Sequence, residues 1–302
     1  MIDERSLAVC YVTGEGIYNQ TIVSISSLLA NNPENEFKIY IIDSAFNEKF
    51  SRNIQLLSAN YPEIEVSYRA VEEGYLDLVP RDAGMFHWST NIRLLLPRLV
   101  PDEIEWILYL DYDTIVDDDI TSITQYLKES LYVAGVMEEV RLAQTDIDKI
   151  VKYINAGVLI INATLWREDG LCEFLLEYVR EVKPKYADQN AINSQIDYEQ
   201  IGLLPLQYNI SRRMWDNISP ELNTSNLRPK IYHFWGPWKP WHKFSHHELD
   251  FIWRYYYDKC PIQIEIDQYK SGWLMDVFES IILQNMDFDA KLRRIINRIL
   301  FS

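Results

Sequence analysis

Two carboxylates stand one residue apart where an apolar run of the sequence ends. The segment from Trp106 to Asp119 reads W-I-L-Y-L-D-Y-D-T-I-V-D-D-D and places Asp111 and Asp113 at that point. A short run rich in Ile, Leu and Tyr predicts a strand that is buried on both faces of a parallel sheet. Because side chains two positions apart on a strand point the same way, both carboxylates would converge just past its carboxyl end. Open α/β sheets bind their ligands at that edge.

A divalent cation would explain this pair of carboxylates. Burying two like charges without compensation is costly. Oxygen donors are the ligands that Mg²⁺ and Mn²⁺ prefer, and such ions are commonly shared with substrate phosphates. The alternative is a strand end followed by a solvated acidic loop, since D-x-D triplets also arise by chance.

A second polar group follows another short apolar run. The segment from Tyr232 to His242 reads Y-H-F-W-G-P-W-K-P-W-H. His233 would end a strand, and a neutral imidazole is a suitable ligand for Mn²⁺ beside two carboxylates. Gly236 would let the backbone approach a phosphate closely, and Lys239 would place an ammonium on a diphosphate. A histidine among tryptophans is by itself more often a core residue, but its combination with Gly, Lys and the D-Y-D favours a phosphate and metal site.

Two further triplets carry the hydrogen-bonding groups that bind sugars. They are Asn155-Ala156-Gly157 and Asp188-Gln189-Asn190. Asn, Asp and Gln together offer the donors and acceptors that sugar hydroxyls require. The structural alternative is that Asn155 closes a turn and that Asp188 caps a helix.

Hydrophobic patterning predicts the elements that must position these groups. Short apolar runs predict strands at residues 7–12, 37–42, 64–71, 106–111, 131–137, 157–161, 201–206 and 231–234. Helices are predicted at 17–29, 48–59, 90–99, 165–183 and 187–194, of which 90–99 carries Arg93. The alternation of strands and helices at the start of the chain implies right-handed crossovers and a parallel sheet. We therefore expect an α/β fold, with the polar segment 138–152 covering the site as a loop or helix.

Composition and charge exclude several classes of protein. The 302 residues, 48% of them hydrophobic, suffice for one large α/β domain with a small appendage or for two modest domains. A net charge of −16 argues against a protein that binds nucleic acid, although a divalent cation can still join a nucleotide to an acidic protein. Neither G-x-G-x-x-G nor G-x-x-x-x-G-K-S/T occurs, which argues against a Rossmann dehydrogenase and a P-loop enzyme.

The amino terminus, the cysteines and the tail bear on location. The sequence M-I-D-E-R-S has no apolar signal core behind it, and no stretch is as long and apolar as a membrane-spanning helix. The three cysteines are widely spaced, so neither a disulfide framework nor a zinc site is expected. We therefore predict a reducing, cytoplasmic location. From Lys291 to Phe301 the chain predicts a basic amphipathic helix, which would either contact the inner face of a membrane as a peripheral anchor or dock on the body of the protein.

Together these motifs resemble the retaining glycosyltransferases of family 8. The resemblance rests on the apolar strand ending in D-Y-D, then Y-I-N-A-G-V-L-I-I-N-A-T-L-W, D-Q-N and H-F-W-G-P-W-K-P-W-H, in the family's order from Leu7 to His242. The family includes bacterial lipopolysaccharide galactosyltransferases and glycogenin. The resemblance implies an A-type glycosyltransferase fold, a UDP-hexose donor and Mn²⁺, with Mg²⁺ as the alternative. We accordingly expect a catalytic domain over residues 1–260 and a mainly helical extension over 261–302.

The resemblance also implies a role for each candidate residue. Asp111, Asp113 and His233 would bind the metal ion, and Gly236 and Lys239 would contact the diphosphate. The candidate catalytic residues, next to the donor sugar, would be Asn155, Asp188 and Gln189, with Gln189 beside the anomeric carbon. Further contacts with the nucleotide sugar would come from Arg93, Tyr112 and Gly157.

Two segments depart from the family pattern. The family usually has an acidic residue and an asparagine near the end of the first strand, where uridine binds, but here the sequence is V-T-G-E-G. We therefore expect Val12 and Thr13 to hold uracil through backbone groups and Tyr18 to stack on it. The usual D-Q-D is D-Q-N, so that Asn190 is uncharged.

These observations predict metal-dependent transfer of galactose or glucose, with retained anomeric configuration, to a hydroxyl of a glycan on a cell-surface glycoconjugate or glycoprotein. The Gln189 amide is a poor nucleophile, so attack by the acceptor on the face of the leaving group is favoured over a covalent intermediate on Asp188. One alternative is a non-catalytic carbohydrate-binding protein on the same fold, and another is self-glucosylation on a tyrosine. A third, a sugar-1-phosphate nucleotidyltransferase, would need Arg in a phosphate loop, and no Arg or Lys follows Gly14 and Gly16 there.

Overall fold

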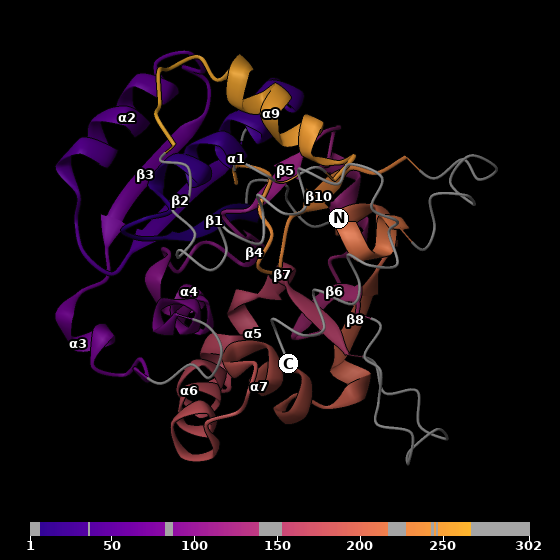
Figure 1. Ribbon diagram of the computed structural model, residues 1–302. Helices are drawn as coiled ribbons and strands as arrows, with labels where there is room; N and C mark the ends of the chain where they lie inside the picture. The colour runs from indigo at the N-terminus through magenta and orange to yellow at the C-terminus, as the bar shows by residue number, and fades with distance from the viewer. Residues whose placement is uncertain are drawn as a thin grey trace, which may run out of the picture.

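A seven-stranded sheet forms the centre of the part of the chain that the structure describes (Figure 1). The structure is a computed structural model, and it describes residues 7–35, 37–81, 87–138, 153–216, 228–242, 245 and 247–266. The strands of the sheet are β1 (Leu7–Thr13), β2 (Lys38–Asp43), β3 (Glu65–Ala70), β4 (Trp106–Leu110), β6 (Val133–Met137), β7 (Ile154–Asn162) and β8 (Ile201–Leu204). Their order across the sheet is β3-β2-β1-β4-β7-β6-β8.

Within this sheet, β7 runs against the other six strands. It pairs antiparallel with both β4 and β6, whereas the remaining neighbours pair parallel. The amino end of β7 therefore lies at the same edge as the carboxyl ends of β1, β4 and β6. That edge is where open α/β sheets bind ligands.

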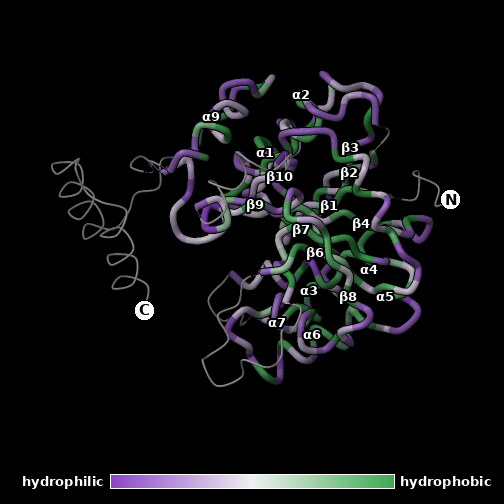
Figure 2. Tube along the Cα trace, turned by 90° about the vertical axis from the view of Figure 1, so that its right-hand side faces the viewer, coloured by the Kyte–Doolittle hydropathy of each residue, from purple (hydrophilic) through white to green (hydrophobic). Residues whose placement is uncertain are grey.

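Alternate side chains of the central strands enter two separate cores, whereas β3 at the end of the sheet has no buried residue. One core is covered by η2 (Trp88–Leu95), α4 (Leu96–Leu99), α5 (Ala163–Glu168), α6 (Leu171–Val182) and α7 (Ala187–Gln195). The other is covered by α1 (Tyr18–Asn31), α2 (Glu48–Ser58) and η3 (Thr121–Tyr126). Burial on both faces explains why the strands read as continuous apolar runs. Figure 2 shows these hydrophobic strands in the middle of the molecule.

A three-stranded sheet adjoins the same edge. It contains β5 (Thr114–Val116), β10 (Ile231–His233) and β9 (Ile210–Ser211), with β10 in the middle. Together with α1 and α9 (Asp250–Lys259) it encloses a third apolar core. The three residues between β4 and β5 are the D-Y-D segment, so the chain passes from one sheet to the other through the candidate site. The remaining elements are short: α3 (Glu73–Leu76), η4 (Tyr198–Gln200) and η5 (Leu206–Tyr208).

The predicted α/β class with a mostly parallel sheet is confirmed, and the largest differences from the predicted elements lie in three segments. Residues 90–99 form a 3-10 helix followed by one α-helical turn that contains Pro97, whose missing N–H disfavours a longer helix. The predicted helix 165–183 is two helices, because Gly170 adopts a φ of +64° that an α-helix does not accommodate. The strand predicted at 157–161 begins earlier, so Asn155 lies inside β7.

Two predictions fall on residues that the structure does not describe. One is that residues 139–152 cover the site, and the other is that Lys291 to Phe301 form an amphipathic helix. The division at residue 260 stays a prediction, since residues 267–302 are also outside the described part. None of the described helices is long and apolar enough to cross a membrane.

Candidate functional site

The two carboxylates of the D-Y-D segment converge because the chain turns between two strands. Asp111 directly follows β4, and Asp113 directly precedes β5. The amide of Thr114 donates to the Asp111 carbonyl at 3.1 Å, and the amide of Asp111 donates to the Gly157 carbonyl at 2.9 Å. The predicted convergence is present, but a hydrogen-bonded turn produces it and not the alternation of an extended strand.

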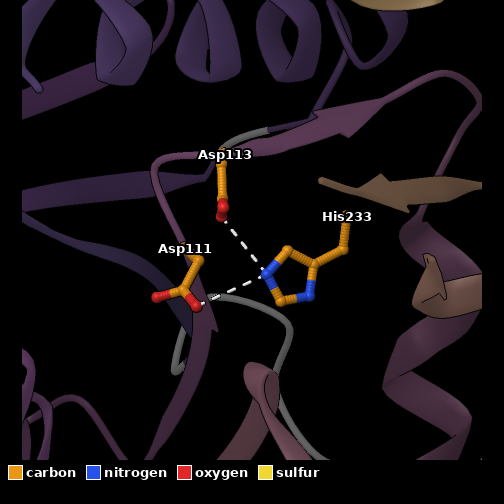
Figure 3. A group of neighbouring side chains, drawn as sticks. All are labelled: Asp111, Asp113 and His233. Atoms are coloured by element: carbon orange, nitrogen blue, oxygen red, sulfur yellow. Dashed lines mark ion pairs between the residues drawn. The ribbon is translucent and has the colours of Figure 1, made fainter. Parts of the chain in front are cut away.

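His233 joins the two aspartates through the register of the small sheet. β10 pairs antiparallel with β5, and His233 lies opposite Thr114, the residue after Asp113. Its Nε2 is 3.2 Å from Asp113 Oδ1 and 3.5 Å from Asp111 Oδ2 (Figure 3). One ligand atom from each of the three residues lies within 4.8 Å of the other two. Strand pairing thus gathers side chains that are far apart in the sequence.

These three side chains fit a divalent cation with oxygen and nitrogen ligands. Asp113 Oδ1 and His233 Nε2 are buried and make no hydrogen bond among the described residues, but they face each other at 3.2 Å as an ion pair. Two carboxylates and an imidazole form a donor set that suits Mn²⁺. The three ligand atoms lie close enough together for one cation to bind all of them.

Gly157 leaves room for the imidazole. A Cβ at this position would lie 2.0 Å from His233 Cε1 and 2.7 Å from both ring nitrogens. Any other residue would therefore displace the ring. Gly157 was predicted to contact the nucleotide sugar, and the structure gives it a steric function next to His233.

The charges of this cluster keep its members ionised. Burial acts to raise the pKa of Asp113, but Lys239 and His233 outweigh it and hold that pKa below its usual value. Burial also acts to raise the pKa of Asp111, and Arg93 outweighs it and lowers that pKa. Burial acts to lower the pKa of His233, but the charges of Asp113 and Asp111 raise it to about 9. The imidazole is therefore charged at neutral pH when only the two carboxylates face it.

Lys239 and Gly236 extend the cluster beyond β10. Lys239 Nζ donates to Asp113 Oδ2 at 2.5 Å and to the carbonyl of Phe234 at 2.9 Å. Gly236 has a φ of +97°, a backbone conformation that favours glycine, in the loop that brings Lys239 to Asp113. The Lys239 ammonium also lies 5.6 Å from the centroid of the Tyr112 ring. A positive charge, held by two hydrogen bonds, therefore lies beside Asp113.

Arg93 connects the aspartate pair with Asp188. Its Nη2 is 3.1 Å from Asp111 Oδ1, its Nε is 2.8 Å from Asp188 Oδ2, and its Nη1 donates to the Ala156 carbonyl at 2.5 Å. The hydroxyl of Tyr109 donates to Asp111 Oδ1 at 2.5 Å. One buried guanidinium thus forms ion pairs with two carboxylates in fixed geometry. Burial raises the pKa of Asp188 to about 6, with Arg93 acting in the opposite direction.

Asn155 and Gln189 share a fourth carboxylate of the site, that of Glu138. Gln189 Oε1 accepts from the Ala156 amide at 2.9 Å, and Gln189 Nε2 donates to Glu138 Oε2 at 2.9 Å. Asn155 Nδ2 donates to the same Glu138 oxygen at 3.3 Å. The analysis of the sequence did not single out Glu138. Its position directly after the carboxyl end of a predicted strand was the signal that could have identified it.

Asn209 is a second residue that the sequence did not reveal. It is buried immediately before β9. Its Nδ2 donates to Asn155 Oδ1 at 3.0 Å, and its Oδ1 lies 3.0 Å from His233 Nδ1. A two-residue strand has no recognisable pattern, so nothing in the sequence marked Asn209.

The residues predicted to hold uracil lie at the carboxyl end of β1 and contact other protein groups. Val12 and Thr13 are buried, and Thr13 Oγ1 is 2.8 Å from Thr21 Oγ1. The ring of Tyr18 stacks on Phe50 with centroids 4.7 Å apart. One face of Tyr18 is therefore already used, and its contact with a base stays a prediction.

Comparisons with known proteins agree on one family. The sequence model of the family described as "Glycosyl transferase family 8" matches residues 11–245. General stress protein A of Bacillus subtilis (strain 168) is 25% identical over 73% of this chain and 82% of its own length. A lipopolysaccharide 1,2-glucosyltransferase of Escherichia coli (strain K12) is 25% identical over 79% of this chain and 74% of its own length.

A solved structure shows the same fold. The galactosyltransferase LgtC, in complex with donor and acceptor sugar analogues, superposes with a TM-score of 0.73 at 19% identity, over 85% of this chain and 98% of that chain. The predicted A-type glycosyltransferase fold is thereby confirmed.

Proposed function

Because the chain belongs to glycosyl transferase family 8 and is thus a glycosyltransferase, we propose that it moves galactose or glucose from a UDP-sugar to a hydroxyl of a glycan. The transfer retains the anomeric configuration and depends on Mn²⁺, or on Mg²⁺ in its place. A relative named as a glucosyltransferase and a structural neighbour named as a galactosyltransferase support a hexose as the transferred group.

The observation that carries this proposal is the cluster of Asp111, Asp113 and His233, whose ligand atoms lie within 4.8 Å of one another. These side chains would hold the cation. A divalent cation bound there would neutralise the charge that develops on the departing diphosphate. Binding a glycan without turnover would require no such gathering of buried ligands, so the cluster favours catalysis over a purely carbohydrate-binding function.

Lys239 and Arg93 organise the charges around the donor. The side chain of Lys239 is 14% exposed, so its ammonium can also reach a phosphate oxygen from the position that it holds beside Asp113. Gly236 would let the backbone approach that phosphate. Arg93 holds Asp111 and Asp188 in one arrangement, and Asp188 would accept hydrogen bonds from hydroxyls of the sugar.

Gln189 is suited to binding and poorly suited to attack. Its amide oxygen accepts from the Ala156 amide and its amide nitrogen donates to Glu138, so both ends are held. We therefore favour attack by the acceptor hydroxyl on the face from which the diphosphate departs. The bond from C1 to the phosphate oxygen breaks as the bond to the acceptor oxygen forms, and the departing phosphate oxygen takes the hydroxyl proton. A sugar adduct trapped on Asp188 would instead support a covalent intermediate.

The acceptor that we propose is a glycan on a cell-surface glycoconjugate or a glycoprotein. The lipopolysaccharide named for one relative is an acceptor of this kind. Self-glucosylation on a tyrosine would be revealed by an increase in intact mass of one hexose after incubation with the donor alone.

The test is a panel of UDP-sugars incubated with the protein and Mn²⁺, with UDP release as the measurement. We expect turnover with UDP-galactose or UDP-glucose, and loss of turnover when a chelator removes the metal. Absence of UDP release from every donor would favour the non-catalytic alternative. Release of pyrophosphate from UTP and a sugar 1-phosphate would favour the nucleotidyltransferase.

A further inference from the structure

A continuous chain of hydrogen bonds joins Glu138 to the imidazole of His233. Asn155 Nδ2 donates to Glu138 Oε2 at 3.3 Å, and Asn209 Nδ2 donates to Asn155 Oδ1 at 3.0 Å. Asn209 Oδ1 then lies 3.0 Å from His233 Nδ1. Both asparagines are buried, with 7% of Asn155 and 2% of Asn209 exposed, so water competes little for these bonds.

The direction of these hydrogen bonds follows from groups whose role as donor or acceptor is fixed. The amide of Gly157 can only donate, and it donates to Asn155 Oδ1 at 2.9 Å. On its other side, Asn155 presents its nitrogen to Glu138 Oε2, which agrees with this orientation. The oxygen of Asn155 is thus directed toward Asn209, which must present its NH₂ group there and its oxygen to His233. Because an amide oxygen only accepts, Nδ1 of His233 carries the hydrogen.

We infer that Asn209, oriented by Asn155, is a positioning residue that fixes the tautomer and ring orientation of His233 for cation binding. The inference rests on the proposed function of the cluster. With Nδ1–H donated to Asn209, the lone pair of the neutral ring is on Nε2, the atom that faces Asp111 and Asp113. Histidine ligands of metals generally donate their other N–H to an acceptor, and changes to that acceptor typically weaken metal binding 10- to 100-fold.

The experiment is a calorimetric titration of the full-length chain with Mn²⁺ in the presence of saturating UDP. For Asn209→Leu, which has a similar size and no acceptor, we expect Mn²⁺ affinity to fall by about tenfold or more. Asn209→Asp keeps an acceptor oxygen for Nδ1–H but turns an oxygen toward Asn155 Oδ1 in place of the NH₂ group, so its loss of Mn²⁺ affinity should be clearly smaller than that of Asn209→Leu. Asn155→Leu leaves Asn209 free to turn its NH₂ toward the ring, so a loss smaller than that of Asn209→Leu is expected.

A matched control separates this effect from a general loss of stability. Asn32 is also a buried, hydrogen-bonded asparagine, but it holds the loop after β5 through the amide of Ile120. Asn32→Leu should lower the unfolding temperature and leave Mn²⁺ affinity unchanged.

The outcomes distinguish this inference from the proposed function. Unchanged Mn²⁺ affinity in Asn209→Leu, or equal losses in folded Asn209→Asp and Asn209→Leu, would overturn the inference alone. If Asn209→Leu does not fold, Asn155→Leu decides, since unchanged affinity there would contradict the chain of bonds. If the unchanged protein with UDP binds no Mn²⁺, both the inference and the proposed metal dependence fail.

Discussion

The proposed donor site has a metal end, formed by Asp111, Asp113 and His233, and a nucleoside end, formed around Val12, Thr13 and Tyr18. The two ends differ in the hydrogen bonds that their buried polar groups make. At the metal end, Asp113 Oδ1 and His233 Nε2 lack a hydrogen-bond partner within the described part of the chain. At the nucleoside end, the hydroxyl of Thr13 lies 2.8 Å from that of Thr21. The carboxylate of Asp43 there accepts from the hydroxyl of Tyr68 at 2.8 Å.

This contrast indicates which end depends more on its ligand. Two buried carboxylates and an imidazole are held together at the metal end by ion pairs and have ligand atoms without hydrogen bonds, so a cation would contribute most there. The nucleoside end is already completed by protein groups and would gain only stacking and backbone contacts from a base. Substitutions should therefore have large effects at the first end and small effects at the second.

The largest effect is expected for Asp113→Ala. It removes one candidate metal ligand and leaves the Lys239 ammonium without its carboxylate. We expect transfer to fall by about 1,000-fold or more at any Mn²⁺ concentration, since several kcal/mol of charge stabilisation are lost. Asp118→Ala, in the acidic run that follows β5, is the control and should keep near-normal turnover. UDP release measures both, and near-normal turnover in Asp113→Ala would refute the metal assignment.

Gly157→Ala tests the space around the imidazole. Its Cβ would meet His233 Cε1 at 2.0 Å, so the ring must move away from the aspartates. We expect Mn²⁺ affinity to fall by about 10- to 100-fold and stability by about 1–3 kcal/mol. Gly74→Ala in α3, where a Cβ would have no atom within 4 Å, should change neither by a comparable amount. Calorimetry and thermal unfolding provide the measurements. Normal Mn²⁺ affinity in Gly157→Ala would show that the ring position does not matter.

The pH dependence of donor use tests the electrostatic link from the metal end to the sugar. Asp188 has a pKa raised to about 6, so it is charged above that pH and takes up a proton below it. The protonated carboxyl of Asp188 no longer forms an ion pair with Arg93, and it accepts hydrogen bonds from the sugar only weakly. The kcat/KM for the donor should therefore fall as the pH drops through about 6. The fall should approach tenfold per pH unit. Asp188→Asn should have lower activity throughout and lack this step; a step that persists in Asp188→Asn would assign it to another group.

The smallest effect is expected at the nucleoside end. Tyr18→Ala would remove a ring that can stack on a base. Losing a stacking contact of about 1–2 kcal/mol should raise the KM for the donor about 5- to 30-fold. Tyr18→Phe keeps the ring and loses only the hydroxyl that contacts Asp43, so about a twofold change or less is expected. The kcat should change little in either variant. A fall of kcat as large as that of Asp113→Ala would remove the contrast between the two ends.

The sequence determined the parts of this protein that follow from local patterns. Continuous apolar runs identified the strands, since burial on both faces leaves a direct mark on composition. The position of Asp111 and Asp113 after one run, and of His233 at the end of another, placed all three at an edge of the sheet. The spacing of His233, Gly236 and Lys239 likewise predicted groups that the structure brings to one place.

Only the tertiary structure decided how these parts meet. The antiparallel direction of β7 brings Asn155 and Gly157 to the ligand edge, and strand direction depends on pairing partners that are remote in sequence. Asn209 and Glu138 entered the site in the same way, through contacts across the fold. Side-chain types and spacing are local properties and can be read along the chain. Register, strand direction and the partners of buried polar atoms are set by long-range contacts, and no local pattern encodes them.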